Sequence, residues 1–313
     1  MKYLHHIWVF FALFCIVWTA SAQQEASFSL YMFNHQSINP AYVGATGYSQ
    51  ITVGSRNQWD GILGAPVTHA VSVSHLFKNK NLGFGISSIN DKIGPTERVN
   101  IAADMAYHLK LNAQGLKLGV GLKFSSRSLQ LDTSLLTYID SNDPFLGISQ
   151  DYNFSPNVGF GLYLQNKNFY FGVGVPYFIE DEELYLQRNF YAIGGALINV
   201  GSFLKIKPSI LLQKTESLPL VYDNSVLFSI NDIFWIGPQY RSNIKNGLPN
   251  QNTAGFFGGF MGVNISQNLS IGYAYQGALA NATIGITNTS HEILLRYQFS
   301  PKNIGFLRSP RLF

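Results

Sequence analysis

Apolar side chains alternate with polar or small ones along most of this chain, from about residue 50 to residue 299. In the run 116–124, one set of alternate positions carries leucine, valine and phenylalanine, and the other set carries lysine and glycine. Successive side chains of a β-strand point to opposite faces, so such a run is typical of a strand with one apolar face. The pattern therefore predicts an all-β protein.

The spacing of these runs also follows a pattern. We predict fourteen strands, at about residues 50–57, 67–77, 81–90, 98–109, 114–125, 152–165, 168–176, 188–199, 202–213, 221–230, 232–241, 254–265, 268–277 and 290–299. Short gaps alternate with longer ones, and the longest gap runs from Ser126 to Asp151. This alternation predicts a transmembrane antiparallel β-barrel with short periplasmic turns, long extracellular loops and both barrel ends in the periplasm.

The composition fits a membrane barrel better than a soluble sandwich. Charged residues make up 12% of the chain, against about 25% in soluble domains. No apolar stretch after the N-terminal leader approaches the length of a spanning helix, and a closed sheet is the other structure that satisfies all its backbone groups within a membrane. Lys117, Lys123, Asp104 and Arg296 share the face opposite the apolar one, together with many glycines. We expect that face to line a crowded or strongly curved lumen.

The N-terminus predicts export. Lys2 precedes an apolar run from Ile7 to Trp18, and Ala20–Ala22 offers a cleavage site. This run is shorter than the ~17 residues of a membrane span, so residues 1–22 are predicted to be a cleaved signal peptide. The only cysteine, Cys15, lies in this leader. Disulfides, thiol catalysis and a lipoprotein anchor are therefore not expected in the mature protein.

Two segments flank the predicted barrel, which we assign to residues 50–299. Residues 23–49 are rich in aromatic side chains, so we expect an ordered segment that either plugs the lumen or packs against the periplasmic rim. It would serve as a docking element for a periplasmic partner or simply as a lid. Residues 300–313 form a basic, aromatic tail on the periplasmic side. The tail is predicted either to bind a partner or to act as an assembly signal.

Candidate polar chemistry is sparse. Arg56 falls on the lumen face, where it could pair with Asp104 or Glu292, and Trp59 is predicted to be an aromatic of the membrane interface rather than a ligand-stacking residue. The acidic run 180–183 is interpreted as a solvated loop because its spacing matches no calcium loop.

The sequence does not predict an enzyme. His69, His75, His108 and His291 show no metal-ligand spacing. Ser290 and His291 are neighbours on one strand, so they point to opposite faces and cannot form a nucleophile–base pair. The net charge of +4 is too small to indicate nucleic-acid binding. We expect no catalytic activity, cofactor or metal.

Several motifs together resemble one family. They are 28–34 (FSLYMFN), 38–44 (INPAYVG), 56–61 (RNQWDG), 65–68 (APVT), 290–293 (SHEI), 297–299 (YQF) and 309–313 (SPRLF). The chain is similar over nearly its whole mature length to the PorP/SprF family of Bacteroidetes outer-membrane proteins. One departure is Asn288-Thr289, where members commonly have glycine.

The resemblance implies an outer-membrane protein of type IX secretion and gliding motility that helps secrete or anchor a cell-surface protein such as an adhesin. The implied partners are that exported protein, periplasmic or outer-membrane components of the machinery, and membrane lipid. An outer-membrane porin or uptake channel for small solutes is the alternative. The family-motif or partner-contact candidates are Tyr31, Phe33, Asn34, Asn39, Pro40, Ala41, Tyr42, Gly44, Arg56, Gln58, Trp59, Gly61, Pro66, His291, Glu292, Arg311 and Phe313.

Overall fold

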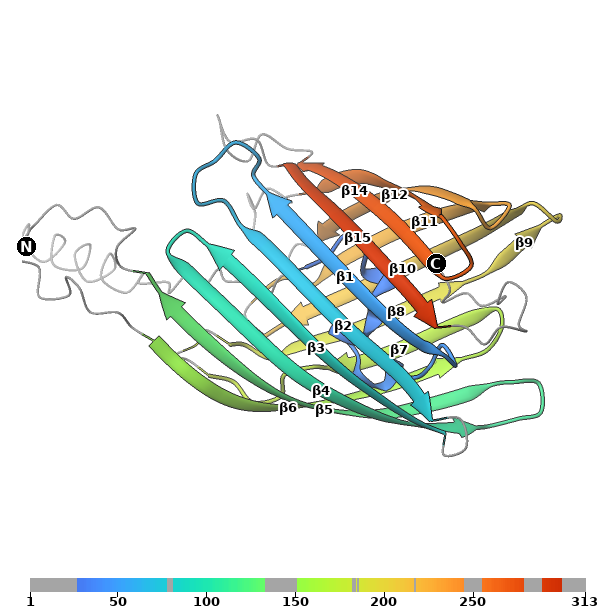
Figure 1. Cartoon of the computed structure of the whole chain (residues 1–313), viewed down its shortest axis with the longest axis horizontal. Coiled ribbons are helices and arrows are strands. Elements are labelled where there is room, and N and C mark those ends of the chain that lie inside the picture. The colour runs from blue at the N-terminus through green and yellow to red at the C-terminus, as the bar shows by residue number, and fades with distance from the viewer. Residues whose placement is uncertain are drawn as a thin grey trace, which may run out of the picture.

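The computed structural model describes residues 27–77, 81–132, 151–181, 184, 186–216, 218–244, 255–278 and 289–299. The predicted signal peptide and the predicted C-terminal tail lie outside these residues. The described strands form one antiparallel sheet that closes on itself (Figure 1). They are β1 Ser49–Gln58, β2 Val67–Phe77, β3 Leu82–Ile93, β4 Thr96–Lys110, β5 Lys117–Leu131, β6 Asp151–Gln165, β7 Phe169–Val175, β8 Asn189–Ala196, β9 Ile198–Val200, β10 Leu204–Thr215, β11 Val221–Ile230, β12 Phe234–Asn243, β13 Phe256–Asn264, β14 Leu269–Ala278 and β15 Thr289–Phe299.

The ring closes where β1 pairs with β15, from Ser49 opposite Phe299 to Gln58 opposite Ser290. β8 and β9 are two parts of one barrel strand, because both pair with β10 and their register continues without an inserted residue. The break between them faces the part of β10 that contains Pro208, which has no backbone N–H to donate to the ladder. Fourteen strands therefore pass around the barrel, as the sequence pattern predicts.

The predicted strand bounds agree closely with the structure, with two differences. β5 continues to Leu131 rather than ending near residue 125. The predicted long gap between the third and fourth strands is wrong, because β3 and β4 pair as far as Ile93 opposite Thr96 and leave only a tight turn. Oppositely charged cross-strand neighbours, Asp91 with Arg98 and Lys92 with Glu97, support this extension.

The two faces of the wall differ as the alternation predicts. Large apolar side chains such as Phe84, Ile101 and Phe124 are exposed on the outside, where lipid would contact them. Asp104, Lys123 and Arg296 are buried inside. No helix in the described part of the chain is long and apolar enough to span a bilayer.

Residues 27–48, which we call the lumen segment, lie inside the barrel (Figure 1, blue). The segment contains three short 3-10 helices, η1 Tyr31–Phe33, η2 His35–Ser37 and η3 Pro40–Tyr42. η3 starts with proline, and the Asn39 side chain caps it by accepting a hydrogen bond from the Ala41 N–H at 2.9 Å. The segment starts beside the ends of β1 and β12 that carry the longer loops, and it finishes at the opposite end, where β1 begins.

Candidate functional site: the filled lumen

Glycines in the wall allow the lumen segment to approach the strands closely. Gly121, Gly161 and Gly174 are register neighbours on β5, β6 and β7. A Cβ on Gly121 would lie 2.2 Å from the Ala41 nitrogen, and one on Gly161 would lie 2.0 Å from the Asn39 Oδ1. These positions therefore require glycine because the segment occupies the space of a side chain. The predicted crowding of the interior is confirmed.

Asn39 anchors the segment at this glycine row. Its side-chain amide donates hydrogen bonds to the carbonyl oxygens of Leu162, at 2.9 Å, and Val173, at 3.1 Å. Its Oδ1 holds the start of η3, as described above. The side chain is buried and its hydrogen-bonding capacity is largely used by the barrel wall and by the turn itself. The Asn39 side chain thus stabilises the turn within the lumen segment and also attaches the segment to the barrel wall.

Four wall side chains, Arg56, Gln239, Arg241 and Glu292, bind the main chain of residues 27–30, and we call them the main-chain clamp. The Glu292 carboxylate accepts hydrogen bonds from the N–H groups of Ser29, at 2.6 Å, and Leu30, at 3.0 Å. On the same side, the Arg56 guanidinium donates to the Ser27 carbonyl and lies 3.7 Å from Glu292. Of the two acids predicted as partners of Arg56, the structure therefore selects Glu292.

The other half of the clamp comes from β12. Arg241 donates to the carbonyl of Phe28 at 3.0 Å and forms an ion pair with Asp223 at 2.8 Å. Gln239 donates to the carbonyl of Ser29 at 2.9 Å. Gln239, Arg241 and Asp223 were not predicted as site residues from the sequence. Their inward positions in the alternating pattern of β11 and β12 were the available signal, but the pattern could not show that they meet the N-terminal segment.

A buried ion pair holds the middle of the segment. Asp104 on β4 and Lys123 on β5 are opposite one another in register, and their charged atoms are 2.9 Å apart. Gln36 donates from its side chain to Asp104 at 2.9 Å and accepts at its carbonyl from Lys123 at 3.4 Å. Both charges are almost fully removed from solvent. Each charge thus compensates the other in a site where neither would be stable alone.

Replacing Lys123 by methionine is expected to lower the free energy of unfolding by about 3–5 kcal/mol, because Asp104 would keep a buried charge without its partner. The double replacement of Lys123 by methionine and Asp104 by leucine should recover much of this loss. Denaturant unfolding of the detergent-solubilised barrel measures both. Equal stability of the single variant and the wild type would contradict this role for the pair.

Aromatic side chains also pack between the segment and the wall. Phe33 packs on Trp235, with ring centroids 4.7 Å apart, and lies under the Arg296 guanidinium at 5.1 Å. His35 contacts the Tyr163 hydroxyl at 3.0 Å. The hydroxyl of Tyr31 lies 3.1 Å from the hydroxyl of Ser225.

The structure divides the predicted site residues into two described groups. The lumen group, all buried or nearly so, consists of Tyr31, Phe33, Asn34, Asn39, Pro40, Ala41, Tyr42, Gly44, Arg56 and Glu292. The other group lies at the outer end of β1 and β15 and consists of Gln58, Trp59, Gly61, Pro66 and His291. Arg311 and Phe313 lie outside the described residues.

The outer group lies at the tip of the β1–β2 hairpin and on the adjacent end of β15. The Gln58 N–H donates to the Pro66 carbonyl at 2.9 Å, and the Trp59 N–H donates to the Thr289 carbonyl at 2.7 Å. Trp59 has a left-handed backbone with φ of 56°. His291 contacts the Tyr273 hydroxyl at 2.7 Å, while its neighbour Glu292 points into the lumen. The role of Trp59 at the membrane interface stays a prediction.

Other candidate chemistry is confined to structural contacts in the described residues. His108 donates from Nε2 to the Val43 carbonyl at 2.7 Å, so it also holds the lumen segment. In the acidic loop, Asp181 accepts a hydrogen bond from the Ser155 hydroxyl at 2.6 Å, and Glu182 and Glu183 lie outside the described residues. Within the described ranges, no group of three or more histidine or acidic side chains is placed to hold a metal ion.

The closed antiparallel sheet, its apolar outer face and its polar interior define an outer-membrane β-barrel protein. The family described as type IX secretion system membrane protein PorP/SprF matches residues 20–297. The chain therefore belongs to the PorP/SprF family and is an outer-membrane protein.

Several solved structures of outer-membrane proteins resemble this chain weakly. No curated protein matches the chain. Among solved structures, it is similar to the Acinetobacter baumannii outer membrane protein Omp33, with a TM-score of 0.49, 10% identity and coverage of 80% of this chain and 99% of that one. It is also similar to a mutant of the TodX monoaromatic hydrocarbon channel, with a TM-score of 0.45, 11% identity and coverage of 80% of this chain and 88% of that one. A third similar structure is the KdgM porin in complex with disordered oligogalacturonate, with a TM-score of 0.39, 10% identity and coverage of 80% of this chain and 99% of that one. Likenesses at this level say nothing about what this chain transports or binds.

Proposed function

We propose that this protein is a closed outer-membrane barrel of the type IX secretion system that helps secrete or anchor a cell-surface protein, such as an adhesin, through protein contacts. The observation that carries the proposal is the filled lumen. The lumen segment is buried along most of its length and is bound by the main-chain clamp, by Asn39 and by the Asp104–Lys123 pair. A barrel closed in this way serves as a scaffold better than as a conduit.

A porin is the second candidate, and it would need an aqueous path along the lumen. A cavity of about 30 Å³ lies at the outer end of the segment, beside Phe28 and Tyr31. A cavity of this size holds only a few water molecules. Passage of a solute through the space that the segment occupies would require the segment to leave, with the loss of its hydrogen bonds to the wall.

The partner contacts must lie on surfaces that a partner can reach. Tyr31, Phe33 and Tyr42 have exposed fractions of 2% or less, so they cannot serve as docking side chains for a periplasmic protein in this state. In contrast, Ile62 and Leu63 are exposed at the extracellular tip between β1 and β2, and Leu63 is fully exposed. An exposed apolar tip is a favourable anchor for a protein interface.

Replacing Leu63 by aspartate should reduce the amount of one exported protein at the cell surface, because a charge at the tip would oppose an apolar contact. The measurement compares surface-exposed proteins of cells that carry the gene deletion, the wild-type gene or the variant. Leu111 to aspartate is the control, because Leu111 is a half-exposed leucine in the periplasmic turn between β4 and β5.

The gene deletion also separates the two candidate functions. Loss of a surface protein with normal uptake of small solutes supports the secretion and anchoring function. Impaired uptake with an unchanged set of surface proteins would contradict it. A reduction caused by the Leu111 variant alone would place the contact in the periplasm.

A further inference from the structure

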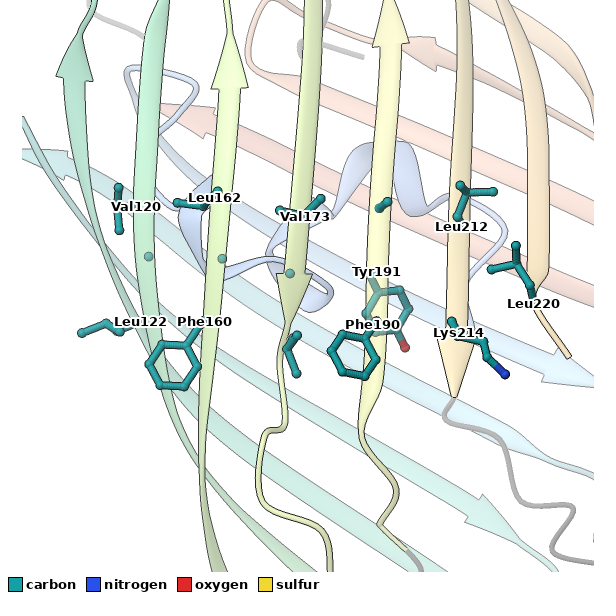
Figure 2. A pocket seen from close by; sticks show the side chains of 15 residues that line it. Val120, Leu122, Phe160, Leu162, Val173, Phe190, Tyr191, Leu212, Lys214 and Leu220 are labelled. Carbon is teal, nitrogen blue, oxygen red and sulfur yellow. The ribbon is translucent and has the colours of Figure 1, made fainter. Parts of the chain in front are cut away.

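The outer wall of the barrel contains an apolar hollow of about 570 Å³ that crosses β5, β6, β7, β8 and β10 (Figure 2). Leu122, Phe160, Val175, Phe190 and Lys214 form one row across these strands, and register links Leu122 to Phe160, Phe160 to Val175, and Phe190 to Lys214. The volume lies in the range of about 300–1,000 Å³ that is usual for small-molecule sites. The hollow lies on the outer face of the barrel, which carries the exposed apolar side chains, so membrane lipid surrounds the hollow.

The base of the hollow is backbone rather than side chain. Gly121, Gly161 and Gly174, the row against which the lumen segment packs, also line the hollow. Figure 2 shows the lumen segment directly behind these strands. On β8, the lipid-facing residue between Phe190 and the glycine at 194 is Ala192, whose small side chain adds to the space. The three glycines therefore allow the lumen segment to pack closely against the inner side of the wall, and they also shape the hollow on its outer side.

One charged side chain, Lys214, lines the hollow at the edge near the extracellular side. It is the second-last residue of β10, next to the outer loop before β11. Its ammonium group donates to the main-chain carbonyls of Leu218 and Glu216. An ammonium group has three N–H donors, so one donor is left for a ligand. A cation at the outer edge of an apolar hollow matches a lipid with an anionic headgroup.

The direction of the hollow fits an acyl chain. Strands of outer-membrane barrels tilt by roughly 35–45°, so a row perpendicular to the strands also runs obliquely through the membrane. Lys214 is near the outer end of β10, whereas Leu122 lies in the periplasmic half of the long strand β5. A lipid whose headgroup meets Lys214 can therefore lay a chain over Phe190 and Phe160 toward the bilayer interior.

We propose that this hollow binds a phosphorylated lipid of the outer leaflet, the lipid A anchor of lipopolysaccharide, with a phosphate at Lys214 and one acyl chain along the row. Lipid tails contact the whole outer wall, so burial of apolar surface does not favour this place over others. The preference comes from the concave fit and from the charge-assisted hydrogen bond to phosphate.

The test is native mass spectrometry of the full mature protein in detergent with bisphosphorylated lipid A added. The wild type should retain one lipid A, and Lys214 to alanine should lower the affinity by about tenfold, the effect of about 1.4 kcal/mol. Lys92 to alanine is the control, because Lys92 is an exposed lysine near the outer end of β3, away from the hollow. Equal retention by the wild type and the Lys214 variant would overturn the assignment.

A second pair of variants tests the hollow itself. Ala192 to tryptophan fills it and should abolish retention, whereas Val71 to tryptophan on the lipid-facing side of β2 should leave retention unchanged. Phosphatidylglycerol and dephosphorylated lipid A, added in parallel, should bind more weakly than bisphosphorylated lipid A. Equal retention of phosphatidylglycerol would overturn lipid A as the occupant. Loss of a co-purifying protein in the Ala192 variant, without a change in lipid, would show a protein occupant instead.

Discussion

A barrel whose lumen segment is replaced by a flexible linker is expected to conduct ions, whereas the wild-type protein is expected to be silent. The variant exchanges residues 28–44 for a glycine–serine sequence of the same length, which behaves as a flexible coil. It removes the side chains of Asn39 and Gln36 that bind the wall and the packing of Phe33, so only main-chain contacts such as those of the clamp are left to hold a flexible chain in the lumen. Planar-bilayer recordings of the purified proteins measure the difference.

The wild-type recording is informative by itself, because stable conductance steps in the unmodified protein would contradict a closed lumen. Should the linker variant fail to fold, a locked variant provides the second measurement. Asn34 and Ser72 have side chains in contact at 3.1 Å, and the predicted mature chain has no other cysteine. A disulfide between cysteines at these two positions should leave the conductance of the wild type unchanged. A conductance that appears only on reduction of this disulfide would show that the segment leaves the lumen spontaneously.

Replacing Gly161 by alanine is expected to destabilise the barrel by about 1–3 kcal/mol or more, because one methyl group overpacks the interior. The added Cβ would lie 2.0 Å from the Asn39 Oδ1, which also caps η3, so the anchor of the lumen segment has to move. Gly121 to alanine should behave similarly, since its Cβ would meet the backbone of Ala41. Denaturant unfolding and the heat-dependent shift of the folded band on a gel measure the loss.

Gly194 to alanine is the matched control for both glycine variants. A Cβ at this position would meet its nearest neighbours at 3.8 Å, which is ordinary van der Waals contact. Its stability should equal or slightly exceed that of the wild type, because glycine in a strand is unfavourable relative to alanine. A loss at Gly194 as large as that at Gly161 would show that strand glycines matter for curvature rather than for the fit of the segment.

The ion pairs inside the barrel could be predicted only in part from the sequence. The alternation on β4 and β5 places Asp104 and Lys123 on the lumen face, and their pairing follows once the register is known. Arg56 was placed inside with two possible acids, and the choice of Glu292 depends on β15 pairing with β1. That contact joins residues 236 positions apart in the chain (292 − 56). Local periodicity contains no information about such a closure.

The amino-acid sequence by itself determined the wall of this protein: its strands, its strand number, the faces of its side chains and its family. These follow from short-range physics, because a strand alternates its side chains and a membrane demands an apolar outer face and paired backbone groups. Only the tertiary structure decided what fills the barrel, which wall groups hold the main chain of residues 27–30, and where the outer surface is hollow. Those features arise from packing between residues distant in sequence, where fitting one backbone against another depends on ring closure and register.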